Sequence, residues 1–490
     1  MKQLVVSFIF IAILTSCTSD GSSDQLAIFQ HGVASGDPLQ DRVVIWTRVT
    51  APGNQESIEV DWEFATDSLF ERIIKYGKFT TGPDRDFTVK MDISGLNPGT
   101  KYYYRFKSLG ETSMIGRTKT ASQVTNEIKL AIVSCSNYEW GYFNAYKRIA
   151  ERKDLDAVLH LGDYIYEYGT RQYRDSTISR FVQPEHEIVS LEDYRTRYAH
   201  YRTDPDLQAV HAAHPFITIW DDHEIANDSY VDGAQNHQQE EGDYIQRKGI
   251  ARKVYYEWLP VREDEKLYRK ISYGSLMDLV MLDERLEGRT KQLDSLQDPR
   301  FNDPSRSMLG EEQLAWFKNT LLSSQAKWKV IGNQVIYSDL RSASGGRNLD
   351  SWEGYPIEKQ KIARFFIDEK IKNAVWVTGD THTSWAFETM VEPVSEEPFA
   401  VEFGATSVNS GNWGDGKTSE QVAEREKGIL ENNPHLKYTN QKDHGYLLLT
   451  IKPDQVKADF MFVETNKVRS DKEVLGYSAI VRSGTSRISQ

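Results

Sequence analysis

The pattern of hydrophobic and polar positions changes once along the chain, near residue 122. Before that point, short alternating or apolar stretches are separated by turn residues such as the Asn-Pro-Gly triplet at 97–99. The clearest stretches cover residues 42–49, 58–64, 87–93 and 101–107. Alternation with period two between frequent turns predicts strands, and we expect residues 26–122 to form an all-β sandwich of the fibronectin or immunoglobulin type.

After a polar link at 121–126, apolar strand-like stretches alternate with helical ones. The predicted strands are 128–133, 157–161, 216–220, 279–282, 328–331 and 374–378, with helical segments at 142–151 and 192–213 and a closing hairpin at 445–451 and 457–463. Nearly uncharged, β-branched runs such as 128–133 are typical of strands buried on both faces. Residues 126–490 are therefore predicted to be a layered α/β domain flanked by helices, separate from the N-terminal sandwich.

The first 25 residues have a different character. A lysine precedes an eleven-residue, largely apolar run at 4–14, which is too short for a helix across a bilayer core of about 30 Å, so residues 1–16 are predicted to be a signal peptide. The sequence Leu-Thr-Ser-Cys that ends at Cys17 resembles a bacterial lipobox. We expect cleavage before Cys17, a lipid on its thiol, a polar tether over 17–25 and an exported, membrane-anchored lipoprotein. An ordinary secretory signal is the alternative.

Composition narrows the class of protein. A chain of 490 residues with 39% hydrophobic and 27% charged residues can bury a large core, which excludes wholesale disorder and collagen. Two cysteines exclude a disulfide framework, and Cys135 is expected to be a free thiol. The net charge of -13 argues against general attraction to nucleic acid or to anionic membranes. An anionic ligand therefore needs a local positive site, and no specific nucleic-acid partner is expected.

Polar side chains recur where the predicted strands end. They are Cys135, Asp163, Tyr166, Asp221, Asp222, His223, Asn333, Asp380 and His382. Taken singly, the aspartates could cap helices, Cys135 could be a small buried residue and His382 a core histidine. Because the carboxyl ends of parallel strands share one edge, however, the set is expected to gather there. Thiolate, carboxylate, phenolate and imidazole groups together predict a metal site.

Three of these segments resemble sequence blocks of the metallophosphoesterases in their purple-acid-phosphatase-like form. Residues 162–166 resemble the Gly-Asp-x-x-Tyr block, residues 220–224 the Gly-Asn-His-Asp/Glu block and residues 379–382 the Gly-His-x-His block. Aspartate replaces asparagine in the second block and the first histidine in the third, and Cys135 replaces the usual first-strand aspartate. These departures are typical of the alkaline phosphatase D branch. Residues 32–48 also resemble the leading β-domain of that branch.

The resemblance implies a ferric ion beside one or two calcium ions. Carried over by position, the iron ligands would be Cys135, Asp163, Tyr166 and His382, and the second cation would be held by Asp222, Asn333 and Asp380, with Asp163 bridging. Thiolate, phenolate and imidazole suit iron, whereas an all-oxygen set suits calcium. Gln334 offers the same atoms as Asn333, so the choice between the two stays open.

The resemblance also implies an exported phosphatase in which cation-activated hydroxide attacks phosphorus in line. Asp163 and His223 would be the catalytic residues, with His223 protonating the leaving oxygen. Asp221 would either orient that imidazole or be structural. Arg285 would either reach the phosphate or form an ion pair with Asp283.

Two rival functions remain at this point. The same metals could act on phosphodiesters, such as teichoic-acid-like polymers, phospholipid head groups or nucleic-acid ends. Alternatively, the chain could be a surface-anchored binding protein with an inactive phosphatase domain. Aromatic residues at 140, 164, 166 and 168 could stack on a substrate ring or simply pack the rim. A monomer is expected.

Overall fold

The computed structural model of the chain describes residues 27–489 apart from 51, 52, 54 and 265. The predicted signal peptide, the tether and Cys17 therefore lie outside the described residues. No helix in the described ranges is both long enough and apolar enough to cross a membrane. The strands form a ten-stranded, a seven-stranded and a five-stranded sheet.

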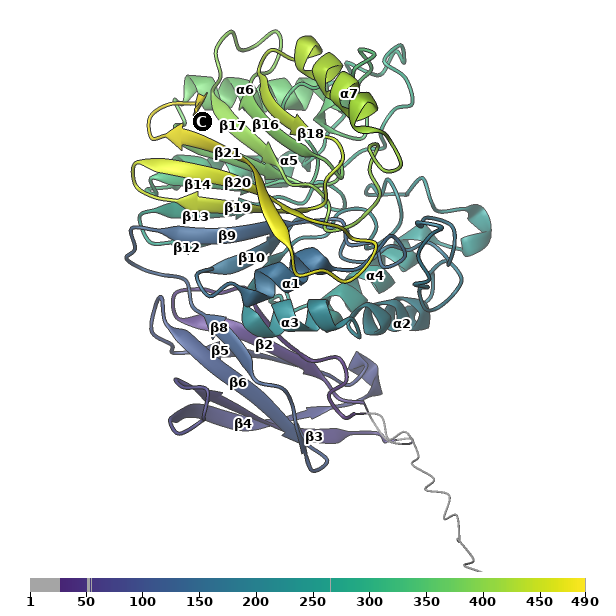
Figure 1. Cartoon of the computed structure of the whole chain (residues 1–490), viewed down its shortest axis with the longest axis vertical. Helices are drawn as coiled ribbons and strands as arrows, with labels where there is room; N and C mark the ends of the chain where they lie inside the picture. The colour runs from purple at the N-terminus through teal and green to yellow at the C-terminus, as the bar shows by residue number, and fades with distance from the viewer. Residues whose placement is uncertain (1–26, 51–52, 54, 265, 490) are drawn as a thin grey trace, which may run out of the picture.

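The N-terminal part is a β-sandwich, drawn in purple and blue in Figure 1. Its strands are β1 (Val33–Gly36), β2 (Arg42–Arg48), β3 (Ile58–Ala65), β4 (Ile73–Thr81), β5 (Thr88–Ser94), β6 (Lys101–Ser108), β7 (Glu111–Thr112) and β8 (Gly116–Lys119), with a short 3-10 helix at Pro83–Arg85. β3 and β6 alternate buried and more exposed residues, and their buried side chains pack on those of β2 and β5. The sequence prediction of an N-terminal all-β domain is confirmed.

This domain is joined to the rest of the protein by backbone hydrogen bonds that the sequence pattern did not predict. β1 pairs in parallel with β11 (Pro215–Thr218), so β1, β2 and β5 extend the main sheet to ten strands. The packing at this junction is close, because a Cβ atom at Gly36 would lie 2.3 Å from the carbonyl oxygen of Pro260. The two domains therefore share one continuous sheet.

Two sheets stack to form the larger domain. The ten-stranded sheet also contains β9 (Ile128–Val133), β10 (Ala157–His160), β19 (Gly445–Ile451), β20 (Gln455–Val463), β21 (Glu473–Arg482) and β22 (Ile488–Ser489). The seven-stranded sheet contains β12 (Arg269–Tyr273), β13 (Met277–Met281), β14 (Trp328–Gly332), β15 (Ala374–Thr378), β16 (Ser384–Thr389), β17 (Ala400–Gly404) and β18 (Leu436–Asn440). In Figure 1, β12, β13 and β14 of the second sheet overlap β9, β19 and β20 of the first.

Side chains of alternate residues build two cores on either side of the seven-stranded sheet. In β15, Val375 and Val377 join the core shared with the ten-stranded sheet, while Trp376 packs on Phe317 and Phe366 of the outer helices. The helices are α1 (Asn144–Glu151), α2 (Leu191–Tyr201), α3 (Pro205–Ala213), α4 (Tyr244–Trp258), α5 (Gly310–Ser323), α6 (Pro356–Asp368) and α7 (Ser419–Asn432), with 3-10 turns at Gln239–Glu241 and Trp352–Gly354. Because successive side chains of a strand point to opposite faces, β15 packs against the ten-stranded sheet on one face and against the outer helices on the other. The layers are therefore helix, sheet, sheet and helix. The predicted layered α/β fold is confirmed.

Local chemistry changes two of the predicted elements. The single helical segment at 192–213 is two helices, because the Asp204 side chain caps α3 and Pro205 occupies its first turn. No helix begins at His223, where the chain forms tight turns instead. The alternative in which Asp221 or Asp222 caps a helix there is therefore wrong, and Asp163 likewise precedes a loop.

Candidate metal centre

The parallel strands bring the predicted ligands to one end of the two sheets. β9, β10 and β11 are parallel neighbours in one sheet, and β13, β14 and β15 in the other. Cys135 follows β9, Asp163 and Tyr166 follow β10, and Asp222 and His223 follow β11. Asp380 and His382 follow β15 in the facing sheet. Loops from both layers therefore meet over a single site.

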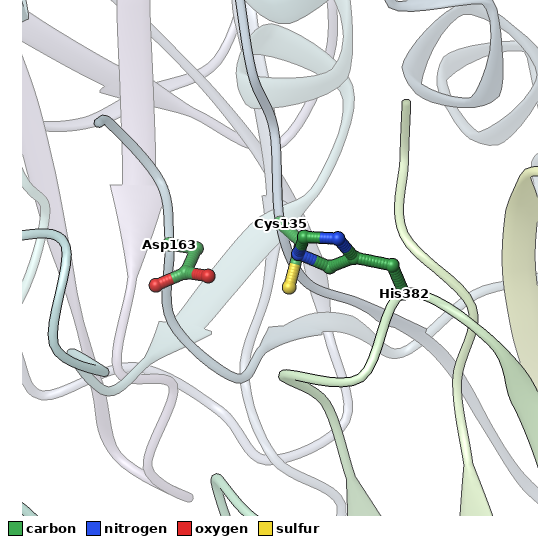
Figure 2. Close-up of side chains that lie close together, drawn as sticks. All are labelled: Cys135, Asp163 and His382. Carbon is green, nitrogen blue, oxygen red and sulfur yellow. The ribbon is translucent and has the colours of Figure 1, made fainter. Parts of the chain in front are cut away.

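A first group of donors joins Cys135, Asp163 and His382. One ligand atom from each lies within 4.8 Å of the others, and Figure 2 shows the three side chains converging from separate segments. The Tyr166 hydroxyl completes this group, 3.1 Å from Asp163 Oδ2 and 3.3 Å from His382 Nε2. All four residues that the resemblance assigned to iron are thus in one place. Ser410, which the sequence analysis missed, donates a hydrogen bond to the Tyr166 oxygen at 2.8 Å.

A second group of donors joins Asp163, Asp222 and His223, again with ligand atoms within 4.8 Å of one another. Asp163 belongs to both groups, as a bridging carboxylate must. Asp222 and Asp380 both face the Arg285 guanidinium, with N–O distances of 3.8 and 3.7 Å. The predicted oxygen ligands Asp222 and Asp380 therefore lie beside the first donor group, which contains the Cys135 sulfur and the His382 nitrogen.

The backbone at these positions is unusual. Cys135, Asp163, Asp380 and His382 have φ angles of 61°, 56°, 63° and 59°. Left-handed backbone is unfavourable for residues other than glycine and persists only where the surrounding structure enforces it. Such strain at four candidate ligands indicates that the strand ends are built to aim these side chains.

The chemistry of the donor set fits bound cations. Asp163 Oδ1, Asp221 Oδ2 and Asp222 Oδ1 are buried oxygens without a hydrogen-bond partner among the described residues. Burial, reinforced by the charge of Asp163, raises the pKa of the Cys135 thiol well above its usual value. Burial, with the charges of Asp221 and Asp350, also raises the pKa of Asp380. Without a cation these groups would tend to be neutral, and a cation is what stabilises their ionised, ligating forms.

Asn333 and Gln334 differ in how their amides are used. The Asn333 side-chain oxygen accepts the Trp352 indole N–H at 3.3 Å, and its nitrogen donates to the Val335 carbonyl. Gln334 Oε1 is buried and has no partner in the described part of the chain, while its nitrogen donates to Trp220 and Leu282 carbonyls. Of the two residues, Gln334 is the one whose amide oxygen is left without a partner by the described residues.

Comparison with known proteins shows the family of the chain. The sequence model of the PhoD-like phosphatase family matches residues 130–460, and the model of its N-terminal domain matches residues 16–122. The chain belongs to the PhoD-like phosphatase family. Alkaline phosphatase D of Bacillus subtilis (strain 168) is 38% identical over 457 residues, covering 88% of this chain and 77% of that protein. A solved structure of PhoD matches with a TM-score of 0.84 and 35% identity, covering 93% of this chain and 90% of the other.

These similarities confirm that the chain is a phosphoric ester hydrolase, as the sequence predicted. They support it over the alternative of an inactive binding protein. In this PhoD-like phosphatase, the substrate is a phosphate ester and the described residues include two groups able to hold a metal ion.

Glu167, not Asp221, orients His223 in this PhoD-like phosphatase. The imidazole Nδ1 lies 2.7 Å from Glu167 Oε2, and the other carboxylate oxygen accepts the Asn227 backbone N–H at 2.8 Å. Burial lowers the pKa of His223, but the charges of Asp222, Glu167 and Asp163 outweigh it and hold that pKa well above its usual value. The arrangement keeps a proton on the ring and leaves Nε2 available. Glu167 directly follows the 162–166 block, which was the one sequence signal for it.

Arg285 has a different role from either one expected. Its side chain is fully buried and does not pair with Asp283, which instead accepts the Arg285 backbone N–H at 3.0 Å. The guanidinium bonds Asp221 and forms a bidentate pair with Asp350 at 2.9 and 3.0 Å. With Asp222 and Asp380 also within 4 Å, it compensates four aspartates. Asp221 is thereby structural, which agrees with one of its two predicted roles.

Buried glutamates fix the ligand loops to one another. Glu224 accepts the backbone N–H groups of Asp163, Tyr164 and Asp221 at 2.6–3.1 Å, which ties the loop after β10 to the loop after β11. Glu284, after β13, accepts the N–H groups of Gln334 and Val335 after β14 at 3.0 and 2.9 Å. Burial raises the pKa of Glu224 to about 7 and that of Glu284 to about 8. These glutamates position the site without facing its substrate.

The mouth of the site is a cavity of about 640 Å³ with an acidic and aromatic lining. Tyr168 and Tyr173 line it, and Tyr173 packs on Trp140 with ring centroids 5.0 Å apart. Tyr164 instead packs in the core against His211 and Tyr198. The described residues that line the cavity include no lysine or arginine.

Removing the Arg285 charge should destabilise the fold. Arg285→Met leaves four aspartates, of which Asp221 and Asp222 are buried, without their shared cation, so the unfolding free energy of chelator-treated protein should fall by about 3–5 kcal/mol. The matched control is Arg341→Met, since Arg341 forms an exposed pair with Glu392 at 3.0 Å and should change stability by less than about 1 kcal/mol. Urea unfolding compares the two, and equal losses would contradict the compensating role.

Proposed function

We propose that this PhoD-like phosphatase is an exported enzyme that hydrolyses phosphate esters at an iron and calcium site. The observation that carries the proposal is that Asp163 belongs to two donor groups of different chemistry. One contains the Cys135 thiol, the Tyr166 phenol and the His382 imidazole, which together suit ferric iron. The other joins Asp163 and Asp222 with His223. With Asp380, which like Asp222 lies within 4 Å of Arg285, its carboxylate oxygens would suit calcium.

When bound, two such cations supply the positive charge that stabilises the phosphoryl oxygens and lowers the pKa of an attacking water. The chain's own residues would do the remaining work. Asp163 holds the two donor groups together, and Glu224 fixes the loop that carries it. His223, held at Nδ1 by Glu167, would present Nε2 to the leaving oxygen and give it a proton. Because the described residues that line the cavity include no basic side chain except histidine, the substrate's charge would be met largely by the cations.

A phosphodiesterase activity is a second candidate. A diester carries less negative charge than a monoester, which suits a cavity whose described lining has no lysine or arginine. Hydrolysis rates on an aryl phosphate monoester and on its matching diester separate the two activities, and no turnover of the diester would remove this candidate.

Export also remains a proposal, based on the apolar stretch at 4–14 and on the sequence that ends at Cys17. The proposed protein is a monomer held at a bacterial membrane by a lipid on Cys17. Fractionation of cells that produce Cys17→Ser tests the anchor. A variant that stays in the membrane fraction as fully as the parent would argue against it.

The metals can be tested through the colour of the protein. Enzyme purified from its own host should contain iron and calcium and absorb visible light, because a tyrosinate bound to ferric iron has a charge-transfer band. Tyr166→Phe should lose that band. Tyr173→Phe is the control and should keep it, because the Tyr173 hydroxyl lies 3.4 Å from His382 Nδ1 and is not a proposed iron ligand. Strong chelation should abolish hydrolysis. A colourless, iron-free and fully active enzyme would contradict the assignment.

The role of His223 can be tested by the leaving group. His223→Gln should reduce kcat by about 100- to 10,000-fold on alkyl phosphates, whose leaving oxygen needs a proton, and much less on 4-nitrophenyl phosphate. His186→Gln is the control, because His186 is exposed and pairs only with Asp193 at 2.9 Å. Equal losses on both substrates would show that His223 does not protonate the leaving oxygen.

A further inference from the structure

A second cavity, of about 360 Å³, lies against the metal centre and has no part in the chemistry described so far. Its apolar lining comes from Ile336, Leu340, Trp385, Trp413 and Ile429. Trp413 remains 39% exposed, although large aromatic side chains are usually buried in a core. An open hollow with two tryptophans provides surface for an apolar or aromatic group.

The two cavities are separated by a single turn of the chain. Thr381 lines the second cavity, while its neighbours Asp380 and His382 line the cavity of the metal centre. The Thr381 hydroxyl accepts the Trp385 indole N–H at 2.8 Å, which anchors the turn to the wall of the second cavity. Because Thr381 lies between Asp380 and His382 in the chain, the second cavity adjoins the metal centre across this turn.

The second cavity also has a cation without an ionic partner. The Arg425 guanidinium lies 4.4 Å from the Trp413 ring centroid, and its side-chain hydrogen bond is to Gln441 Oε1 at 3.4 Å. Among the described residues it forms no ion pair. By contrast, Arg347 on the same lining pairs with Glu353 at 2.7 Å. Arg425 is therefore held in place by stacking while its charge remains available.

The metal-centre cavity cannot provide this contact. Its described lining has five carboxylates, Asp163, Glu187, Asp222, Asp228 and Asp380, and no lysine or arginine. The cations of the proposed function would be engaged by the phosphoryl group, so the described lining offers no lysine or arginine to a second anionic group. The Arg425 side of the turn is where such a group would be attracted.

From this arrangement we infer that the second cavity binds the alcohol part of the substrate, and that this part is an apolar ring carrying an additional anionic group. The ring packs on the apolar wall formed by Trp385, Ile336 and Ile429. The anionic group binds the Arg425 guanidinium through a charge-assisted contact. The inference rests on the phosphatase activity proposed above and extends it to the leaving group.

Two matched substrates test the inference. Phenyl phosphate and 3-carboxyphenyl phosphate have similar leaving groups, but only the second carries an extra anion. The enzyme should bind the carboxylated ester with a KM about tenfold lower, the effect expected of one charge-assisted contact. Arg425→Gln should abolish this preference and leave kcat/KM for phenyl phosphate within about twofold of the parent.

A control on the same helix distinguishes direct contact from general surface charge. Lys427 has a 75% exposed side chain that lies 3.7 Å from Glu431, so Lys427→Gln removes the same charge away from the cavity lining. It should retain the preference, and melting temperatures should show that both variants fold.

Three outcomes would overturn the inference. They are equal KM values in the parent enzyme, a preference that survives Arg425→Gln, and an equal loss in Lys427→Gln. If phenyl phosphate and 3-carboxyphenyl phosphate are both hydrolysed with equal KM values, only this inference fails. If neither ester is hydrolysed, the proposed function itself is wrong.

Discussion

Mutual repulsion of clustered carboxylates is the constraint on which the rest of this structure depends. Asp221, Asp222, Asp350 and Asp380 surround one point where loops from two sheets meet, and all four lie within 4 Å of the Arg285 guanidinium. Buried charges are costly unless they are paired and hydrogen-bonded. A fixed internal cation lets these groups be brought together, while the orphaned oxygens of Asp163 and Asp222 remain free for ligands.

The backbone carries the second part of this arrangement. Left-handed φ angles at Cys135, Asp163, Asp380 and His382 turn the chain sharply as each strand ends. Such conformations need support, and at Asp163 the buried Glu224 supplies it by accepting the backbone N–H. Glu224 connects loops within one sheet and Glu284 connects loops within the other. The donor atoms are thus positioned by residues that themselves bind nothing.

The surroundings of the site separate two tasks. The metal-centre cavity has an acidic lining that suits cations and the phosphoryl group they attract. The second cavity combines apolar surface with the unpaired Arg425 and lies beyond the turn at 380–382. Charge neutralisation and recognition of the alcohol would then occur on opposite sides of one short segment.

The sequence by itself determined the all-β and α/β parts and the central strands, and it nominated the candidate donor set, but it did not predict α4 to α7, β12, β16 to β18 or β21. These features depend on local periodicity and on residue types at strand ends, as in β9, β15 and β19, whose bounds coincide with the predicted strands. Only the tertiary structure decided contacts between distant segments. It placed Glu167 beside His223 and four aspartates around Arg285, and it left the amide oxygen of Gln334 without a partner among the described residues. It also joined β1 to β11. Each of these outcomes depends on which side chains compete for the same buried partner, and local sequence does not encode that competition.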